Sequence, residues 1–281
     1  MAFVTRFAPS PTGPLHLGHA YSALLASDMA QAAGGQFLLR IEDTDIARCR
    51  PDWEAQIYRD LAWLGLRWPT PVRRQSEQLD RYDTALDGLA ERGLLFPCSC
   101  TRTDIRAALS APQEGVEKAQ TYPGTCRHRS MASRRKGDAL RLDMRAAVAT
   151  LSGPLFYDDT GSAQPGQHRI TPHSLVSGHG DIVLGRKDIG TASYVLAAVI
   201  DDADQAITTV VRGADLCEIT DVQVLLQRLL GLPTPGYHHH RLIRDEQGKR
   251  LAKRDDARAI ARYRYEGATP GDIRHMLGLA R

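Results

Sequence analysis

Short apolar segments typical of β-strands alternate along this chain with longer segments that have helical spacing. The short segments include FLLRIE at 37–42 and ITTVVRG at 207–213, and the longer ones include WEAQIYRDLAWLGL at 53–66 and TDVQVLLQRLLGL at 220–232. Strands that alternate with helices build a parallel sheet with the helices packed on its faces. The alternation therefore predicts an α/β fold with a parallel sheet and covering helices.

The middle of the chain departs from this alternation. From Phe96 to about Ile182 it is rich in Cys, Pro, Gly, Arg and short motifs. We therefore predict a core formed by residues 1–95 and 183–281, interrupted by an inserted subdomain at 96–182. Within the insertion, the polar stretch SAPQEGVEKAQ at 110–120 is expected to form a mobile loop.

Composition bounds the class of protein. An apolar content of 42% and a charged content of 25% are ordinary for a globular protein. No run approaches the roughly 20 apolar residues of a membrane helix, and the N-terminus lacks the pattern of a signal peptide, which together indicate the cytoplasm. Five cysteines, an odd number, argue against a disulfide framework in such a chain.

The charges are unevenly distributed although the net charge is only +3. Basic residues cluster at 126–145 and at 241–266. Such clusters suit a phosphate-rich partner, and a solvated surface explains them equally well.

Near the N-terminus, a proline- and glycine-rich loop, FAPSPTGPLHLGH at 7–19, separates an apolar start from a helical segment. In open α/β sheets, ligands bind where strands lead into helices, and a helix N-terminus attracts phosphates. His16 and His19 could donate further hydrogen bonds to phosphate, and Gly18 would leave room for a flat ring against the backbone. The motif favours nucleotide binding, while two surface histidines at a helix start remain the alternative.

Near the other end of the chain lies a glycine-led basic segment, GKRLAKRDD at 248–256. A lysine loop of this kind can close over a triphosphate and stabilise the charge that develops on a leaving pyrophosphate. Taken alone, the segment is more typical of a solvated basic turn.

Four ordered motifs together resemble the class I aminoacyl-tRNA synthetases, in particular their glutamate-specific branch. The motifs are RFAPSPTGPLHLGHAYSAL at 6–24, RIEDTD at 40–45, YVLAAVIDDADQAITTVVRGADL at 194–216 and GKRLAKRDD at 248–256. HLGH stands for the family's first nucleotide motif, and RLAKR stands for its second, lysine-bearing motif. The resemblance extends over nearly the whole chain, and it implies a Rossmann-like parallel sheet with helices on both faces.

The resemblance implies two neighbouring binding sites. For ATP, which acts with Mg²⁺, it implies contacts from His16, Gly18, His19, Arg250, Leu251 and Lys253, of which His16, His19 and Lys253 are the catalytic residues. For glutamate it implies Arg6, Ala8, Ser10, Glu42, Tyr194 and Arg212. Arg6 and Arg212 would recognise carboxylate, since Arg binds it bidentately, and Glu42 would take the α-ammonium.

The resemblance also implies a structural zinc ion in the insertion. The family pattern Cys-x-Cys, spacer, Tyr-x-x-x-Cys matches Cys98, Cys100, Tyr122 and Cys126. Tyrosine is an unusual zinc ligand, so His128 is an alternative fourth ligand. Three thiols without a metal are the other alternative, and Cys49 and Cys217 are expected to be packing residues.

Three features depart from the family pattern or fall beside it. Ala252 stands where the second motif usually has Ser, which removes a hydroxyl contact to phosphate and is expected to slow activation. Lys249 leaves the assignment of the loop lysine slightly ambiguous. Asp43 and Asp45 are expected to tie their segment to a neighbouring helix or to Arg48, and the HHH run at 238–240 is expected to be structural or nucleotide-adjacent.

The length after the lysine loop suggests which RNA is the acceptor. Only about 27 residues follow Arg254, whereas glutamyl-tRNA synthetases carry a long helical anticodon-binding region there. The short form resembles the glutamyl-Q tRNA(Asp) synthetase family, which attaches glutamate to queuosine at the wobble position of tRNA(Asp). The alternatives are a truncated glutamyl-tRNA synthetase that charges a tRNA 3′ end, and a non-catalytic RNA- or amino-acid-binding paralogue. A monomer is the working expectation.

Overall fold

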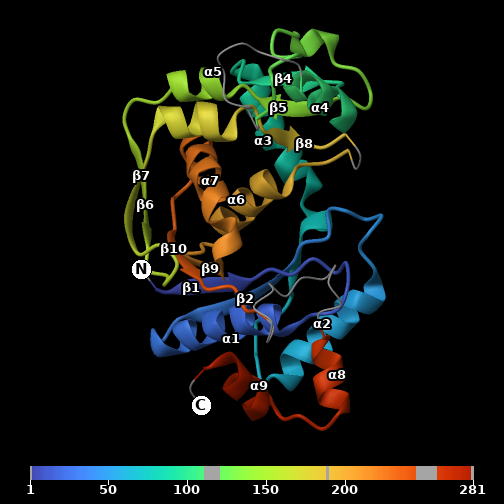
Figure 1. The fold of residues 1–281 in the computed structure, drawn as a ribbon, viewed down its shortest axis with the longest axis vertical. Helices are drawn as coiled ribbons and strands as arrows, with labels where there is room; N and C mark the ends of the chain where they lie inside the picture. Colours follow the sequence, from blue (N-terminus) through green and yellow to red (C-terminus); the bar gives the residue numbers. More distant parts are fainter. Residues whose placement is uncertain (1, 111–120, 188–189, 245–257, 280–281) are drawn as a thin grey trace.

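The computed structural model describes residues 2–110, 121–187, 190–244 and 258–279 (Figure 1). One parallel sheet has the order β1-β2-β3, and a second sheet has the order β7-β6-β10-β9. The two meet where the backbone N–H of Thr208 donates to the carbonyl of Val4 at 2.9 Å, so that β1 lies beside β9. The strands are β1 Val4–Phe7, β2 Gln36–Ile41, β3 Arg73–Arg74, β6 Leu155–Asp159, β7 Gly166–Ile170, β9 Thr209–Gly213 and β10 Gly236–His240.

Helices cover both faces of this sheet, as the sequence predicts. α3 Leu79–Glu91, α6 Tyr194–Asp204 and α7 Cys217–Leu230 contribute to one apolar core. α1 Leu17–Ala32, α2 Pro51–Trp63, α8 Ile260–Tyr265 and α9 Pro270–Leu277 contribute to the other. α1 approaches the sheet closely because the side chains it buries are mostly alanines: Ala20, Ala23, Leu24, Ala26 and Ala30.

A third, smaller sheet forms the far end of the molecule (Figure 1). It consists of the antiparallel strands β4 Leu95–Cys98, β5 Ala139–Leu142 and β8 Val183–Gly185, and α4 Arg102–Ser110 and α5 Met144–Ala149 lie in the same part of the chain. Its own apolar cluster is small, with Phe96, Cys98, Tyr122, Cys126 and Ala139 as the buried members.

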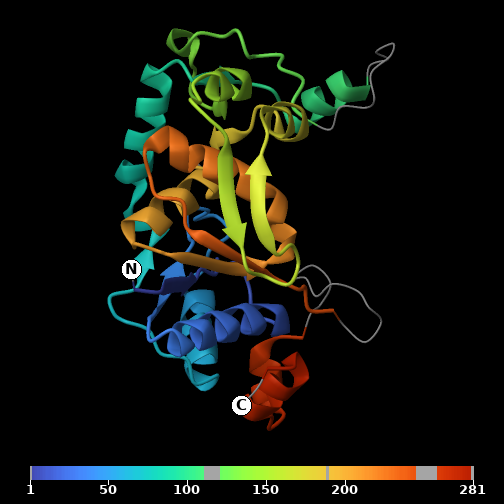
Figure 2. The same cartoon turned by 90° about the vertical axis from the view of Figure 1, so that its left-hand side faces the viewer.

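The strand pairing divides the chain differently from the predicted boundaries of the insertion. The small sheet includes Leu95 and residues 183–185, which the sequence assigned to the core. Conversely, the hairpin β6–β7 lies within 96–182 but pairs with core strand β10 through Asp159 and Tyr237. The reason is the two-residue alternation of β6, which buries Leu155, Tyr157 and Asp159 on the side that faces α7 (Figure 2).

The remaining expectations for single segments have mixed outcomes. The strands and helices predicted from FLLRIE, ITTVVRG and the longer segments are present as β2, β9, α2 and α7. Residues 111–120 of the expected loop and the whole GKRLAKRDD segment lie outside the described residues. Within the described part of the chain, none of the helices combines the length and apolarity that a bilayer span requires.

Candidate active site and metal site

A cavity of about 360 Å³ opens at the carboxyl ends of β1, β2, β9 and β10. This is where an open α/β sheet binds ligands, because the loops after the strands and the N-termini of the following helices meet there. The residues that line it include Arg6, Ala8, His16, Gly18, His19, Ser22, Glu42, Tyr194, Arg212, Asp215, His240 and Ile243. The amino-acid motif and the first nucleotide motif therefore share one cavity.

His16 and His19 build the N-terminus of α1 as a reciprocal cap. The Nδ1 of His16 accepts from the Gly18 N–H at 3.1 Å, and the Nδ1 of His19 accepts from the His16 N–H at 3.1 Å. When neutral, each ring must carry its hydrogen on Nε2, which makes Nε2 a hydrogen-bond donor. The cap thus fixes two donors beside the positive end of a helix.

Gly18 leaves room for this cap. A Cβ on Gly18 would lie 3.0 Å from Cε1 of His16, so the ring of His16 takes the space over this residue. The predicted role of Gly18, room for a flat ring of the ligand, stays a prediction.

Below the cavity floor, buried charges form a paired network. Arg6 donates through Nε and Nη2 to both carboxylate oxygens of Asp202, at 2.8 and 3.2 Å. Arg40, which is fully buried, donates to Asp202 at 2.7 Å and to Glu42 at 3.1 Å. Burial would raise the pKa of Asp202, but Arg6 and Arg40 outweigh it and hold this pKa at about 2.

The same burial acts differently on Glu42, which faces the cavity. Burial raises the pKa of Glu42, and the guanidiniums of Arg40 and Arg6 oppose that rise only in part. An ammonium group in the cavity would lower this pKa again by favouring the carboxylate. Glu42 is therefore a suitable partner for a cationic ligand group.

Arg212 is held by protein acceptors on three of its nitrogens. Its Nε donates to Nε2 of His239 at 3.0 Å, Nη1 donates to Gln223 at 2.7 Å, and Nη2 donates to Thr220 at 2.7 Å. These contacts fix the plane of the guanidinium at the cavity wall before any ligand arrives. Together with the Leu216 carbonyl at 3.3 Å they occupy four of its five N–H groups, so the expected bidentate contact of Arg212 with a carboxylate is not possible in this arrangement.

The predicted zinc ligands lie together in the small sheet and the loop after it. The thiols of Cys98, Cys100 and Cys126 lie within 4.8 Å of one another. The hydroxyl of Tyr122 lies 3.4 Å from Cys98 Sγ and 3.5 Å from Cys100 Sγ. Tetrahedral zinc with bonds of about 2.3 Å to sulfur needs ligand atoms about 3.8 Å apart, so this set fits one ion.

The alternative ligand, His128, is exposed and is not among the grouped ligand atoms. The pKa of one of the three thiols, that of Cys126, also suits a cation, whereas burial raises the pKa of Cys100. Burial raises the pKa of Cys126, yet hydrogen bonds from Tyr122 and from the Ser99 backbone outweigh it and lower this pKa to about 6.

The other predicted residues are placed as follows. Ser10 lies in the loop after β1 but is not among the cavity-lining residues. Arg250, Leu251 and Lys253 lie outside the described residues, as do Lys249 and Ala252. Asp43 accepts from Ser76 at 2.6 Å and Asp45 pairs with Arg48 at 2.6 Å, as expected for structural carboxylates.

Several residues of the site have no role in the sequence prediction. Arg40 and Asp202 lie inside quoted motifs, but their burial against each other could not be read from the motifs. Thr220, Gln223 and Gln227 were detectable in principle, because they form a buried polar stripe on the apolar α7 at helical spacing. His240 of the HHH run lines the cavity and contacts Ser22 at 2.7 Å, as expected for a residue beside the nucleotide motif.

Comparisons with known proteins agree with this geometry. The family model of tRNA synthetases class I (E and Q), catalytic domain, matches residues 2–280. The chain is 56% identical to a glutamyl-Q tRNA(Asp) synthetase of Rhodobacter capsulatus, over 98% of this chain and 100% of that protein. It is 40% identical to one of Symbiobacterium thermophilum, over 98% of this chain and 86% of that protein.

A solved structure of a glutamate tRNA ligase from Elizabethkingia meningosepticum, in complex with its amino acid, has a similar fold. It superposes with a TM-score of 0.75 at 30% identity and covers 96% of this chain. The chain spans 59% of the length of that ligase.

Proposed function

The chain belongs to the class I (E and Q) tRNA synthetase family, and from this we propose that it activates L-glutamate with ATP and transfers the glutamyl group to queuosine at the wobble position of tRNA(Asp). One observation carries the first half of this proposal. A single cavity unites the cap of α1, which suits phosphate, with Arg6, Glu42 and Arg212, which suit an amino-acid dicarboxylate. The choice of acceptor RNA is supported by the name of the relative from Rhodobacter capsulatus, which aligns over its full length.

In the first step, the α-carboxylate of glutamate attacks the α-phosphorus of ATP and pyrophosphate leaves. A carboxylate is already ionised near neutral pH, so the step requires no general base. Catalysis then consists of positioning and of stabilising charge on the phosphate oxygens. The Nε2–H donors of His16 and His19, fixed by their mutual cap, suit that role. Mg²⁺ that enters with ATP would neutralise part of the negative charge of the phosphates.

Recognition of glutamate uses opposite charges on the two sides of the cavity. We assign the α-ammonium to Glu42. Burial raises the pKa of this carboxyl group, and a bound ammonium would lower the pKa again. Arg212 and Arg6 supply the positive charge for carboxylate, with Tyr194 as a hydroxyl contact and the Ala8 backbone beside it. Ser10, Arg250, Leu251 and Lys253 keep their predicted roles as part of the proposal.

In the second step, a hydroxyl of the acceptor attacks the glutamyl-adenylate and AMP leaves. Queuosine carries a cis-diol on its cyclopentene ring, as the ribose of a tRNA 3′ end also does. The same catalytic geometry therefore serves either acceptor, and the acceptor is selected by how the RNA is presented.

We further propose that Cys98, Cys100, Tyr122 and Cys126 hold one structural zinc ion. The fit of three thiols and a phenol around one point supports this assignment. The metal would supply the insertion with stability that its small apolar cluster cannot provide. We also propose a cytoplasmic location, where both ATP and tRNA occur. For the domains, we propose that the chain divides into a catalytic core and an inserted subdomain, and that the hairpin β6–β7 belongs to the core.

The decisive experiment follows labelled glutamate into RNA. The protein is incubated with labelled glutamate, ATP and tRNA(Asp) that either contains or lacks queuosine, and the product is mapped by nuclease digestion. We expect the label in an anticodon fragment, and only in the queuosine-containing tRNA.

Other outcomes would contradict the proposal in different ways. Label on the terminal adenosine would identify a glutamyl-tRNA synthetase. Glutamate-dependent exchange of pyrophosphate into ATP without label in RNA would limit the proposal to glutamate activation. Absence of both would identify a non-catalytic binding protein.

A further inference from the structure

The orientation of Arg212 depends on a residue outside the predicted site. Arg212 donates from Nε to Nε2 of His239 at 3.0 Å, and Arg Nε always carries a hydrogen. Nε2 of His239 must therefore be the acceptor. The imidazole, which burial and the nearby Arg212 keep neutral by lowering the pKa of His239, then carries its hydrogen on Nδ1.

Asp159 receives that hydrogen bond. The Nδ1 of His239 lies 2.5 Å from Oδ2 of Asp159, and both side chains are almost completely buried. The other carboxylate oxygen, Oδ1, accepts from the backbone N–H of Gly161 at 2.8 Å and of His239 at 3.1 Å. Asp159 is thus an acceptor on both sides, and the backbone fixes which oxygen faces the imidazole.

We infer that Asp159 and His239 are positioning residues for Arg212. The Asp159 carboxylate accepts a hydrogen bond from Nδ1 of His239 and so selects the Nδ1–H tautomer. In that tautomer Nε2 has a free lone pair, which accepts the hydrogen bond from Arg212 Nε. Among the described residues, acceptors then take four of the five N–H bonds of Arg212, including Leu216 O at 3.3 Å, which leaves one hydrogen of Nη1 for a ligand. The inference rests on the proposed function, in which Arg212 contacts a glutamate carboxylate.

A metal site is the competing explanation for the same side chains. Ligand atoms of Asp159, Cys217 and His239 lie within 4.8 Å of one another. However, both ring nitrogens of His239 already have hydrogen-bond partners, and a metal ion there would lie beside the positive charge of Arg212. The chain of hydrogen bonds from Asp159 through His239 to Arg212, called the relay below, accounts for the geometry without a metal.

The substitution Asp159→Asn tests the relay through the tautomer. The backbone N–H groups of Gly161 and His239 would keep the amide oxygen, so the amide NH₂ would face His239 Nδ1. The imidazole would then move its hydrogen to Nε2, where it would oppose Arg212 Nε–H. We expect the KM for glutamate to rise about 10- to 100-fold, with the KM for ATP nearly unchanged, in glutamate-dependent pyrophosphate exchange.

Two variants serve as controls. Asp158→Asn changes the exposed neighbour on the same strand and should leave both KM values within about twofold of the wild type. His239→Gln retains a donor for Asp159 and an acceptor for Arg212, so it should keep most of the glutamate affinity. Circular dichroism and thermal unfolding establish that each variant is folded.

A second readout does not depend on catalysis. Nitrogen-15 chemical shifts of His239 should show the Nδ1–H tautomer in the wild type and the Nε2–H tautomer in Asp159→Asn. An Nε2–H tautomer in the wild type, an unchanged KM for glutamate in Asp159→Asn, or equal rises in both KM values would overturn the inference. A wild type without glutamate-dependent exchange would instead refute the proposed function, and the tautomer result would still report on the relay.

Discussion

Several charged residues beside the proposed catalytic cavity are buried, and each is stabilised by an oppositely charged partner. Arg40 has no exposed surface, and Asp202 is 7% exposed. A charge in such a place destabilises the fold unless an opposite charge and hydrogen bonds compensate it. Asp202 compensates two guanidiniums at once, those of Arg6 and Arg40, so it is the most sensitive member of the network.

We predict that Asp202→Asn lowers the free energy of unfolding by about 3 kcal/mol, because Arg6 loses the carboxylate with which it pairs and Arg40 keeps only Glu42 and Asp201 as counter-charges. Denaturant unfolding at neutral pH measures this. Asp204→Asn is a matched control on the same helix, where the carboxylate is partly exposed and pairs with Arg73 and Arg81. Its effect should stay below about 1 kcal/mol, and equal effects of the two variants would contradict the prediction.

The same carboxylate predicts a dependence of stability on pH. The pKa of Asp202 is about 2 in the folded protein, below its ordinary value of 3.8. Its contribution, about 2 kcal/mol, is therefore fully present above pH 4 and is lost as the pH falls through about 2. The difference in unfolding free energy between wild type and Asp202→Asn should shrink over that range, and a constant difference would exclude this origin.

Among the elements, the hairpin β6–β7 links the inserted part of the chain to the site. It reaches the core sheet through a turn in which Gly161 lies against the backbone of β10. A Cβ on Gly161 would lie 2.1 Å from the carbonyl oxygen of His239, a distance that no side chain can adopt. The hairpin can therefore place Asp159 beside His239 only with glycine at this position.

We predict that Gly161→Ala displaces the turn and raises the KM for glutamate, because Asp159 moves away from His239. Gly153→Ala is the control, since a Cβ there meets no atom within 4 Å. Steady-state pyrophosphate exchange measures the effect, and thermal unfolding reports the accompanying loss of stability. Identical KM values in the two variants would show that the turn does not position the site.

The small sheet is the element with the least apolar core of its own. If zinc holds Cys98, Cys100, Tyr122 and Cys126, then its removal by a chelator should open this sheet while the parallel sheet stays folded. Hydrogen exchange of amides in β4 and β5 measures this opening. Cys126→Ser should reproduce it and Cys49→Ser should not, and equal protection with and without chelator would argue against a structural metal.

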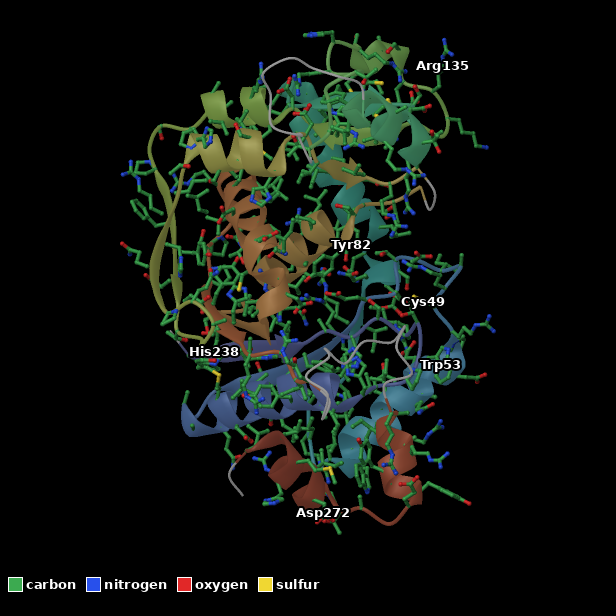
Figure 3. The ribbon with its side chains drawn as sticks, viewed as in Figure 1. Cys49, Trp53, Tyr82, Arg135, His238 and Asp272 are labelled. Atoms are coloured by element: carbon green, nitrogen blue, oxygen red, sulfur yellow. The ribbon has the colours of Figure 1, made fainter. Side chains whose placement is uncertain are left out.

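At the scale of the whole molecule, the proposed catalytic cavity and the inserted part present different surfaces. A second cavity of about 360 Å³ lies where α3 meets the small sheet, and it is lined by Arg134, Arg135, Lys136, Arg186, Lys187, Asp83 and Asp138, among others. Figure 3 places Arg135 at the end of the molecule that holds the small sheet. The excess of positive charge around this second cavity suits the phosphate backbone of RNA.

We predict that replacing Arg134, Arg135 and Lys136 by Ala weakens tRNA binding and flattens its dependence on salt. Each lost phosphate contact should reduce the slope of log K against log salt concentration by about 0.7 to 0.9. Pyrophosphate exchange without tRNA should not change, because these residues are not among those lining the catalytic cavity. Arg228→Ala, an exposed change on α7, is the control, and an unaltered salt slope in the triple variant would refute the prediction.

The alternating α/β fold and the strand–loop–helix that carries His16 and His19 were predictable from the sequence alone, and the resemblance of its motifs to the synthetase family grouped Arg6, Glu42, Tyr194 and Arg212 as one set. These features are local or motif-bound: apolar periodicity, proline and glycine punctuation, and charged residues at fixed spacings within short segments. The sequence also placed the metal-type cluster, because three of its members lie within 29 residues of one another.

Contacts between residues far apart in the sequence became visible in the folded chain alone. Asp159 lies 80 positions before His239, and Arg6 lies 196 positions before Asp202, yet each pair shares a hydrogen bond. The first contact arises from strand order, since β6 joins β10, and the second from the way α6 packs against β1, and neither arrangement has a signature in local periodicity. Whether a charged residue is paired and buried or solvated follows from these arrangements, because the low polarity of the interior makes each unpaired charge costly.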